Sequence, residues 1–194
     1  MGYDKGKLSR NQIVEAASAV ILKKGFDATS LADLSQAAQT SAGKLTHHFP
    51  TKSALFEAVF QELMCGYKAD PLTLLSDLSH PPRQRIEDFF DAVSSFYEAQ
   101  CGPIGCPLGH AAGDTEGVSP AMQQEASSFL EETEAAFEKA FLDLGHAAAP
   151  ARAKAIVFVS AWQGAVVVAR AGRGIAYIRE VFDSLISAAV LNSE

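Results

Sequence analysis

The chain has 194 residues, 48% of them hydrophobic and 20% charged, and its formal net charge is −7. This composition can build a buried core and excludes an intrinsically disordered protein. Three cysteines are too few for the disulfide framework of a small secreted domain. The N-terminal segment lacks the apolar stretch of a signal peptide, and the longest apolar run, residues 155–169, is short for a membrane span. We expect a cytoplasmic protein without a membrane segment.

The charge is distributed unevenly along the chain. Residues 1–52 carry seven Lys or Arg and four Asp or Glu, a net charge of +3, whereas the remainder carries nine and nineteen, a net charge of −10. A basic end on an acidic body indicates a surface for a polyanion such as DNA, because cationic side chains displace phosphate counterions. The small size of the +3 leaves chance as the alternative explanation.

Apolar residues recur with helical spacing along the whole chain, and no strand-like alternation is sustained. Ser9 and Gln12 form a capping-box pattern that predicts the start of a first helix. Gly25 can adopt the left-handed conformation that ends this helix. A second helix is expected to begin after Ser30, with Asp33 three residues on.

Two short helices over 31–38 and 41–48 are separated by a two-residue link, which predicts a helix-turn-helix. Ser41 is the N-cap candidate of the second of these helices. A longer helix follows over 53–64, and the segment from Tyr67 to Pro71 is expected to end it.

Longer helices fill the rest of the chain, and the clearest breaks between them contain Pro or Gly. The expected spans are 85–100, 120–144, 150–171 and 175–191. We therefore predict an all-α protein with an N-terminal helix-turn-helix DNA-binding domain over 8–66. A C-terminal helical domain for ligand binding and dimerisation is expected over 72–191.

The stretch KKGFDATSLADLSQAAQTSAGKLTHHFPTKSALFEAV, residues 23–59, carries several motifs in a fixed order. These are a Gly-Phe corner, Ala-Thr-Ser before the second helix, Gly within the third, His-Phe at its end, and a Lys soon after. In these features the chain resembles the TetR/AcrR family of bacterial transcriptional regulators over about residues 8–66. The resemblance implies a dimeric repressor that is released from a palindromic operator by a small molecule.

The helix over 41–48 is the expected recognition helix. Leu45 and Phe49 use its few core positions, so small polar side chains and a lysine remain free to enter a major groove. Ser30 and Ser41 mark helix N-termini, and a helix N-terminus can bind a phosphate. The resemblance assigns backbone contacts to five positions: Ser41, Lys44, Thr46, His47 and Lys52.

Thr46 departs from the family pattern, which often has tyrosine at this position. Threonine is shorter than tyrosine and cannot make the aromatic side chain's contact with a DNA phosphate. The phosphate contact at this position is therefore weaker, or His47 makes it instead. For His48 we favour a buried structural role over a DNA contact, because it is spaced with Leu45 and Phe49. The alternative for the whole element is a helical hairpin without a ligand.

Residues 155–162 and 166–168 of the helix over 150–171 are apolar nearly all round, and the helix over 175–191 supplies a matching apolar stripe. The two helices are therefore predicted to form a homodimer interface, with an ordinary monomer core as the alternative. Aromatic residues between this pair and the DNA-binding unit suggest an apolar pocket for an apolar or aromatic effector, although such a stripe is also typical of a plain core. The candidate pocket residues are Phe89, Phe96, Tyr97, Phe129, Phe137, Trp162 and Gln163.

Cys106 lies near an expected helix start, where the positive end of the helix dipole favours a thiolate. A thiol that senses oxidants or electrophiles is therefore an alternative regulator, and an inert buried thiol is the other interpretation. Cys106 and His110 could also pair as nucleophile and base of a thiol-dependent enzyme, or as two metal ligands. No convincing third group accompanies them, so we expect no catalytic site, metal or cofactor.

Overall fold

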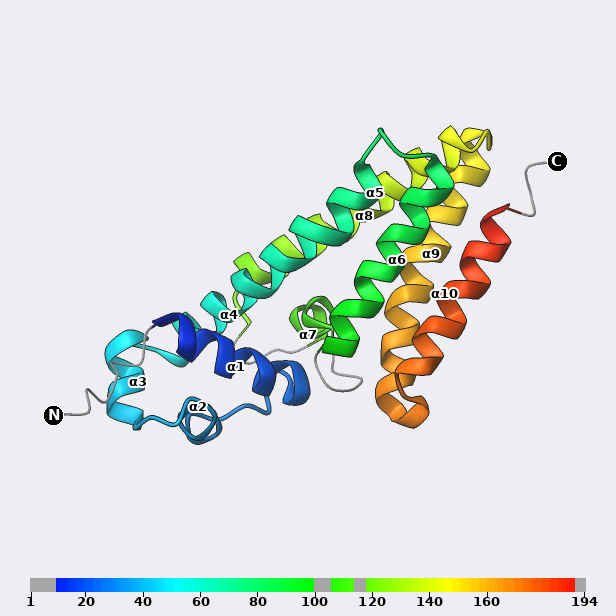
Figure 1. Cartoon of the computed structure of the whole chain (residues 1–194). Helices are drawn as coiled ribbons and strands as arrows, with labels where there is room; N and C mark the ends of the chain where they lie inside the picture. Colours follow the sequence, from blue (N-terminus) through cyan, green and yellow to red (C-terminus); the bar gives the residue numbers. More distant parts are fainter. Residues whose placement is uncertain (1–9, 100–105, 114–117, 191–194) are drawn as a thin grey trace, which may run out of the picture.

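The computed structural model describes residues 10–99, 106–113 and 118–190, and these residues form helices and connections without any strand, which confirms the all-α prediction (Figure 1). In chain order the elements are α1 (Arg10–Lys24), α2 (Leu31–Ala37), α3 (Ala42–His48), α4 (Lys52–Tyr67), the π-helix η1 (Lys68–Leu72), α5 (Thr73–Ser76), α6 (Pro82–Ala99), α7 (Pro107–Gly113), α8 (Pro120–Asp143), α9 (Ala148–Val168), the π-helix η2 (Ala169–Arg173) and α10 (Ile175–Val190).

Side-chain caps fix the starts of the short N-terminal helices. Ser30 caps α2 within a complete capping box, Ser41 caps α3, and Thr51 caps α4 by accepting a hydrogen bond from the Ala54 N–H at 3.1 Å. Gly25 ends α1 with φ at 85°. These predicted boundaries are confirmed, whereas the predicted start at Ser9 lies outside the described residues.

A left-handed residue makes the turn between α2 and α3. Gln39 has φ at 49° and is the one non-glycine residue with positive φ in the described part of the chain. Its N–H donates to the Gln36 carbonyl, and the Thr40 N–H donates to the Ser35 carbonyl at 2.9 Å. These two hydrogen bonds close the C-terminal end of α2, where glycine usually occupies the left-handed position. It directs the chain into α3 over two residues.

α4 ends at Tyr67, the first residue of the segment expected to end it, but the helical path does not stop there. The chain continues through η1, with Pro71 inside it, and then into α5. A π-turn accommodates proline here, since proline lacks the N–H that a regular turn would use. The Thr73 hydroxyl also donates to the Lys68 carbonyl at 2.9 Å. A nearly continuous helical rod therefore runs from the N-terminal unit into the body (Figure 1).

The body is a bundle in which α8 lies along α9, and α10 packs against α9 and α6 (Figure 1). Its core is aromatic: the Phe89 ring lies 4.9 Å from Phe137 and 5.4 Å from Trp162, both edge to face. Arg85 is also buried, and its guanidinium lies 2.6 Å from an Asp143 carboxylate oxygen. Lys139 and Arg85 together lower the pKa of that carboxyl group.

The helix that contains the longest apolar run is longer than the sequence indicated. α9 and η2 together span Ala148–Arg173, 26 residues, which by length and composition alone could cross a membrane. In the fold this helix instead packs along α8 and α10, with Phe158, Trp162 and Val166 buried on its inner side. Its place is that of a bundle helix.

The body contacts the DNA-binding end at the C-terminal end of α1. His110 Nε2, on α7, lies 3.1 Å from Arg170 Nη1 and 3.4 Å from the Leu22 carbonyl oxygen. Arg170 also donates to the Lys23 carbonyl at 3.4 Å. These contacts join three segments that lie far apart in the sequence.

Candidate nucleic-acid interface

α3 buries one side of a helix only seven residues long and exposes the rest. Leu45, and Phe49 just after the helix, are 1% and 2% exposed and hold α3 to the core. The polar residues expected to contact DNA are exposed together on the other side: Ser41, Lys44, Thr46 and His47. The division arises because two apolar positions four residues apart share one helix face.

Some polar side chains of α3 already make hydrogen bonds within the protein, and this limits how they can contact DNA. The Ser41 hydroxyl accepts a hydrogen bond from the Lys44 N–H at 3.3 Å, so it serves as the cap. Thr46 turns its hydroxyl back to the Gly43 carbonyl at 3.1 Å. His48 is half-buried, and its ring lies 5.5 Å from that of His47.

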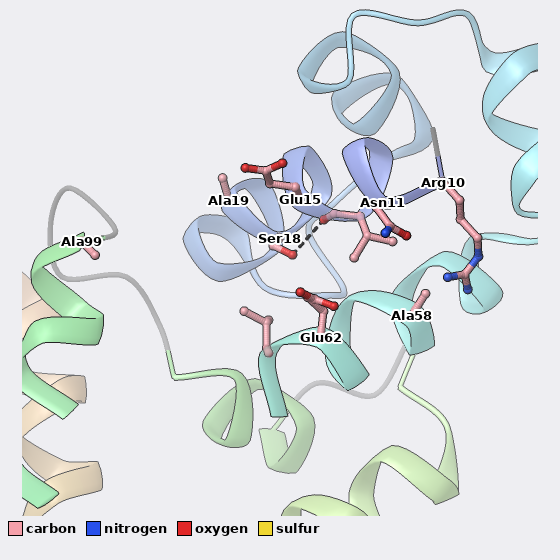
Figure 2. Close-up of a pocket in the computed structure, with 10 residues that line it drawn as sticks. Arg10, Asn11, Glu15, Ser18, Ala19, Ala58, Glu62 and Ala99 are labelled. Carbon is pink, nitrogen blue, oxygen red and sulfur yellow. Dashed lines mark hydrogen bonds between the residues drawn. The ribbon is translucent and has the colours of Figure 1, made fainter. Parts of the chain in front are cut away.

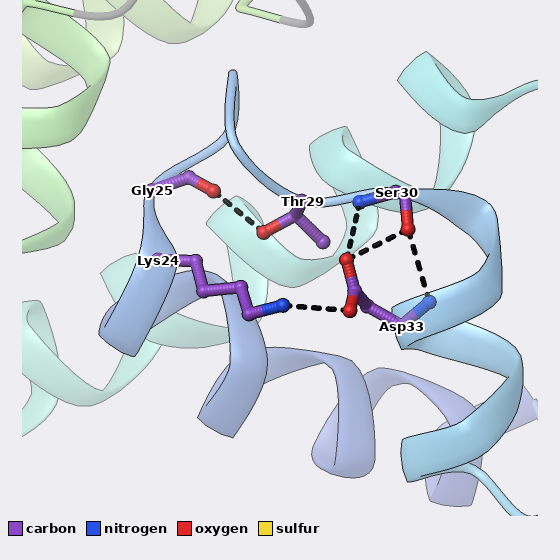
Figure 3. A network of polar contacts seen from close by, with 5 residues as sticks. All are labelled: Lys24, Gly25, Thr29, Ser30 and Asp33. Atoms are coloured by element: carbon purple, nitrogen blue, oxygen red, sulfur yellow. Dashed lines mark hydrogen bonds and ion pairs between the residues drawn. The ribbon is translucent and has the colours of Figure 1, made fainter.

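Ser30 belongs to a closed polar network at the start of α2 (Figure 3). Its N–H and hydroxyl both donate to one Asp33 oxygen, at 2.9 and 2.7 Å, and Lys24 Nζ lies 2.6 Å from the other oxygen. Lys24, followed by Ser30, holds the Asp33 pKa far below its ordinary value of 3.8. A phosphate that approached this helix start would be repelled by the Asp33 carboxylate. The phosphate contact expected at Ser30 therefore stays a prediction.

Two cations flank α3 beside aromatic rings. Lys52 is half-buried, and its ammonium lies 4.9 Å from the centre of the Phe56 ring. The exposed Arg10 guanidinium lies 4.9 Å from the centre of the Phe49 ring. Arg10 was not among the residues expected from the sequence, and its position in the basic N-terminal segment was the available signal.

Two family models match most of the chain. The model of bacterial regulatory proteins of the tetR family matches residues 13–59. The model of the C-terminal domain of LmrA/YxaF-like transcriptional regulators matches residues 82–184, more than half of the chain. The chain belongs to the TetR family. The protein is thus a transcription regulator with a DNA-binding helix-turn-helix, as the motifs of residues 23–59 predicted.

Relatives and solved structures of TetR-family proteins cover nearly the whole chain. The HTH-type transcriptional repressor DhaR of Mycobacterium sp. (strain GP1) is 25% identical over 164 residues, which are 81% of this chain and 80% of DhaR. A TetR regulator from Legionella pneumophila has the same fold, with a TM-score of 0.77 at 22% identity over 97% of this chain and 99% of that chain. AibR, solved with isovaleryl coenzyme A and operator DNA, has a TM-score of 0.66 at 13% identity over 92% and 96%.

Five of the seven candidate pocket residues of this TetR-family protein are fully buried and pack in one aromatic core: Phe89, Tyr97, Phe129, Phe137 and Trp162. Phe96 is part-buried and lines a groove of about 460 Å³ beside η1. Gln163 lines a smaller pocket of about 150 Å³ together with Cys106 and His110.

A second groove, of about 540 Å³, lies between α1 and α4 (Figure 2). It is lined by polar and small side chains, including Arg10, Glu15 and Glu62. The Ser18 hydroxyl on its wall donates to the Val14 carbonyl at 2.8 Å. This lining does not provide the apolar surface that the effector hypothesis requires.

Cys106 is 5% exposed and directly precedes α7, which confirms the expected helix start. Its Sγ lies 4.0 Å from the Tyr67 hydroxyl oxygen. Among the residues that the structure describes, no three His, Cys, Asp or Glu side chains gather closely enough to hold a metal ion. Cys101, the cysteine nearest to Cys106 in the sequence, lies outside the described residues.

Proposed function

We propose that the protein is a cytoplasmic repressor that reads a palindromic operator with α3 of each of two subunits. The exposed polar side of α3 carries the proposal, because Ser41, Lys44, Thr46 and His47 lie on it while Leu45 fixes the helix to the core. Lys52 and Arg10 would add phosphate contacts beside α3. The repressor sign is taken from the name of the relative DhaR.

We infer a homodimer that forms through α9 and α10, the helices expected over 150–171 and 175–191. Two pairs of apolar side chains on the outer side of α9 remain exposed in a single chain: Ile156 at 43% with Val157 at 55%, and Val167 at 67% with Val168 at 37%. Exposed aliphatic side chains gathered on one side of a helix are typical of a protein interface. A two-fold axis through it would present two copies of α3 to one DNA duplex.

We assign DNA binding to the predicted domain over 8–66, and effector binding and dimerisation to the predicted domain over 72–191. The rod of α4, η1 and α5 links the two, since it starts beside α3 and ends in the body. A ligand that binds more tightly to one orientation of this rod than to another would shift the protein toward that orientation. The spacing of the two α3 helices would then change, and the protein would release the operator. The structure of AibR with a ligand and operator DNA supports an effector by analogy. Catalysis is not part of the proposal.

The test is selection of binding sites from fragmented genomic DNA at near-physiological salt, followed by sequencing of the retained fragments. We expect enrichment of one short palindrome whose half-sites lie about one helical turn apart or a multiple of that distance. Retention without a shared motif would show only electrostatic binding, and absence of retention would contradict the proposal.

A thiol-sensing regulator that uses Cys106 is the second candidate. Its support is the position of the thiol before α7 and in the 150 Å³ pocket, beside the groups of His110 and Arg170. The thiol's 5% exposure argues for slow access of oxidants. Mass spectrometry after mild peroxide tests it: modification of exposed Cys65 while Cys106 stays reduced would remove the idea.

A further inference from the structure

Four polar side chains, three on helices and one just before α7, meet inside the aromatic core of the body. Tyr67 ends α4, Tyr97 lies on α6, Cys106 precedes α7, and Trp162 lies on α9; none is more than 5% exposed. The two tyrosine hydroxyl oxygens are 3.0 Å apart, and Cys106 Sγ is 4.0 Å from that of Tyr67. We call these four residues the polar cluster.

The donors of the polar cluster are not all well paired. Each hydroxyl brings one proton, but only one of the two protons lies between the oxygens. The fully buried Trp162 indole N–H, which can only donate, interacts with the Tyr97 hydroxyl but makes no hydrogen bond of good geometry with it or with any other group. A buried donor that is poorly paired is unfavourable, and the misaligned indole N–H therefore calls for an explanation. Burial raises the pKa of both tyrosines, so the hydroxyls stay protonated donors at neutral pH.

Aromatic rings surround these donors. The Tyr67 ring lies 4.6 Å from Phe96, 5.9 Å from Phe129 and 6.0 Å from Trp162. A flat aromatic ligand among these rings would pack against their faces or edges. An oxygen on the ligand would give the cluster a further hydrogen-bond acceptor.

The groove beside η1 supplies the route to the polar cluster. Both Tyr67 and Phe96 line this groove of about 460 Å³. The part-buried Phe96 ring packs against the rings of Tyr67 and Tyr97, so it is the side chain that has to turn for a ligand to pass from the groove to the cluster. Among the described residues that line the groove there is one carboxylate, Asp70, and no basic side chain. This lining disfavours acids and phosphorylated ligands such as a coenzyme A thioester.

We propose that the polar cluster is the effector site and that it takes a neutral aromatic ligand with a ketone or phenol oxygen, which accepts a hydrogen bond from Trp162. This assignment rests on the proposed function, since it names the ligand class of the body. Because Tyr67 ends the helix that begins at Lys52 beside α3, a ligand at the cluster acts directly on the rod that holds the DNA-reading helix.

The single tryptophan provides the measurement, because the intact protein has one indole N–H resonance, that of Trp162. The probes are acetophenone, ethylbenzene and benzoate, which share a ring and differ in the acceptor. We expect acetophenone to shift the indole proton downfield and saturably. Ethylbenzene should bind about tenfold more weakly, as the loss of one buried hydrogen bond requires, and benzoate more weakly than acetophenone.

Three variants sharpen this test. Trp162→Phe should reduce acetophenone affinity to the level of ethylbenzene, and Phe96→Ala should increase it by removing the ring that has to turn. Phe158→Leu is the matched control, since it perturbs the core around Phe141 and Phe137 without removing a donor. It should leave acetophenone affinity unchanged.

Equal affinity for acetophenone and ethylbenzene, an indole resonance that stays in place at saturation, or no binding of any probe would each overturn the assignment. If Trp162→Phe fails to fold, the wild-type titration still decides the question. Site selection on genomic DNA needs no ligand, so failure of the effector site and failure of the DNA-binding proposal are distinguishable.

Discussion

The exposed faces of α3 and α9 differ in chemistry, and the difference separates two kinds of partner. The outer face of α3 carries hydroxyls, an ammonium and an imidazole around one buried leucine. The outer face of α9 carries Ile156, Val157 and Val167, while its inner face buries Phe158 and Trp162 among small and aliphatic residues. Exposed polar groups near cations suit a phosphate backbone and base edges, whereas exposed aliphatic groups suit a protein surface that excludes water.

The two regions also differ in what holds them together. The helices around α3 are short and start at side-chain caps, so local hydrogen bonds account for much of their definition. The helices of the body are long and bury rings against one another, so apolar packing dominates there. Changes that introduce charge should therefore disrupt the body most, and changes to single polar groups should affect the DNA-binding unit most.

Val167→Arg should have the largest effect. A charge at the centre of the proposed interface would be buried without a partner, weakening dimerisation by about 3 kcal/mol or more. Sedimentation should then show monomers, and operator affinity should fall with the dimer. Ala135→Arg, which places the same charge on an exposed position of α8, is the control and should leave the dimer intact. A Val167→Arg protein that stays dimeric would contradict the interface.

Lys44→Ala and Lys52→Ala should each weaken DNA binding across all sequences by roughly 1 kcal/mol and lower the slope of log affinity against log salt by about 1. The reason is the loss of one phosphate contact and its counterion release. Binding isotherms at several salt concentrations measure both quantities. Lys139→Ala on the body is the control; isotherms unchanged by both α3-side substitutions would refute the assignment.

Acid should loosen the DNA-binding unit through Asp33. Its pKa is lower in the folded protein than its ordinary value of 3.8, so its contribution to stability is fully present above about pH 5. The contribution is lost as the pH falls below 3.8 toward the folded pKa. Asp33→Asn should therefore lower the Tm at neutral pH, and the difference from wild type should shrink between about pH 5 and pH 2. A difference independent of pH would exclude this mechanism.

Gln39→Gly should have the smallest effect and the opposite sign. Glycine removes the strain of the left-handed conformation but gains freedom in the unfolded chain, leaving a net stabilisation of about 0.5 kcal/mol. Urea denaturation measures the change. Operator affinity should not move, and Gln36→Gly, within α2, should destabilise as a contrast.

Local rules read from the sequence predicted the N-terminal unit in detail. Ser30 and Ser41 mark helix starts because their hydroxyls cap the backbone, and Gly25 marks an end because its φ is positive. The same rules predicted the end of α4 near Tyr67 but not the π-helix that continues past Pro71, where η1 packs against α6 and α8. The left-handed Gln39 carried no sequence signal.

By itself, the sequence determined the helical class, the caps and the motif that identifies the family, since these depend on residues within a few positions of one another. Only the tertiary structure decided which aromatic side chains meet and which donors are poorly paired. Tyr67, Tyr97 and Trp162 are brought together from three helices, with Cys106 from the segment before α7. The outer side of α9 becomes recognisable only once its inner side is buried. Burial and the pairing of buried donors depend on the packing of distant segments, which spacing along one helix does not specify.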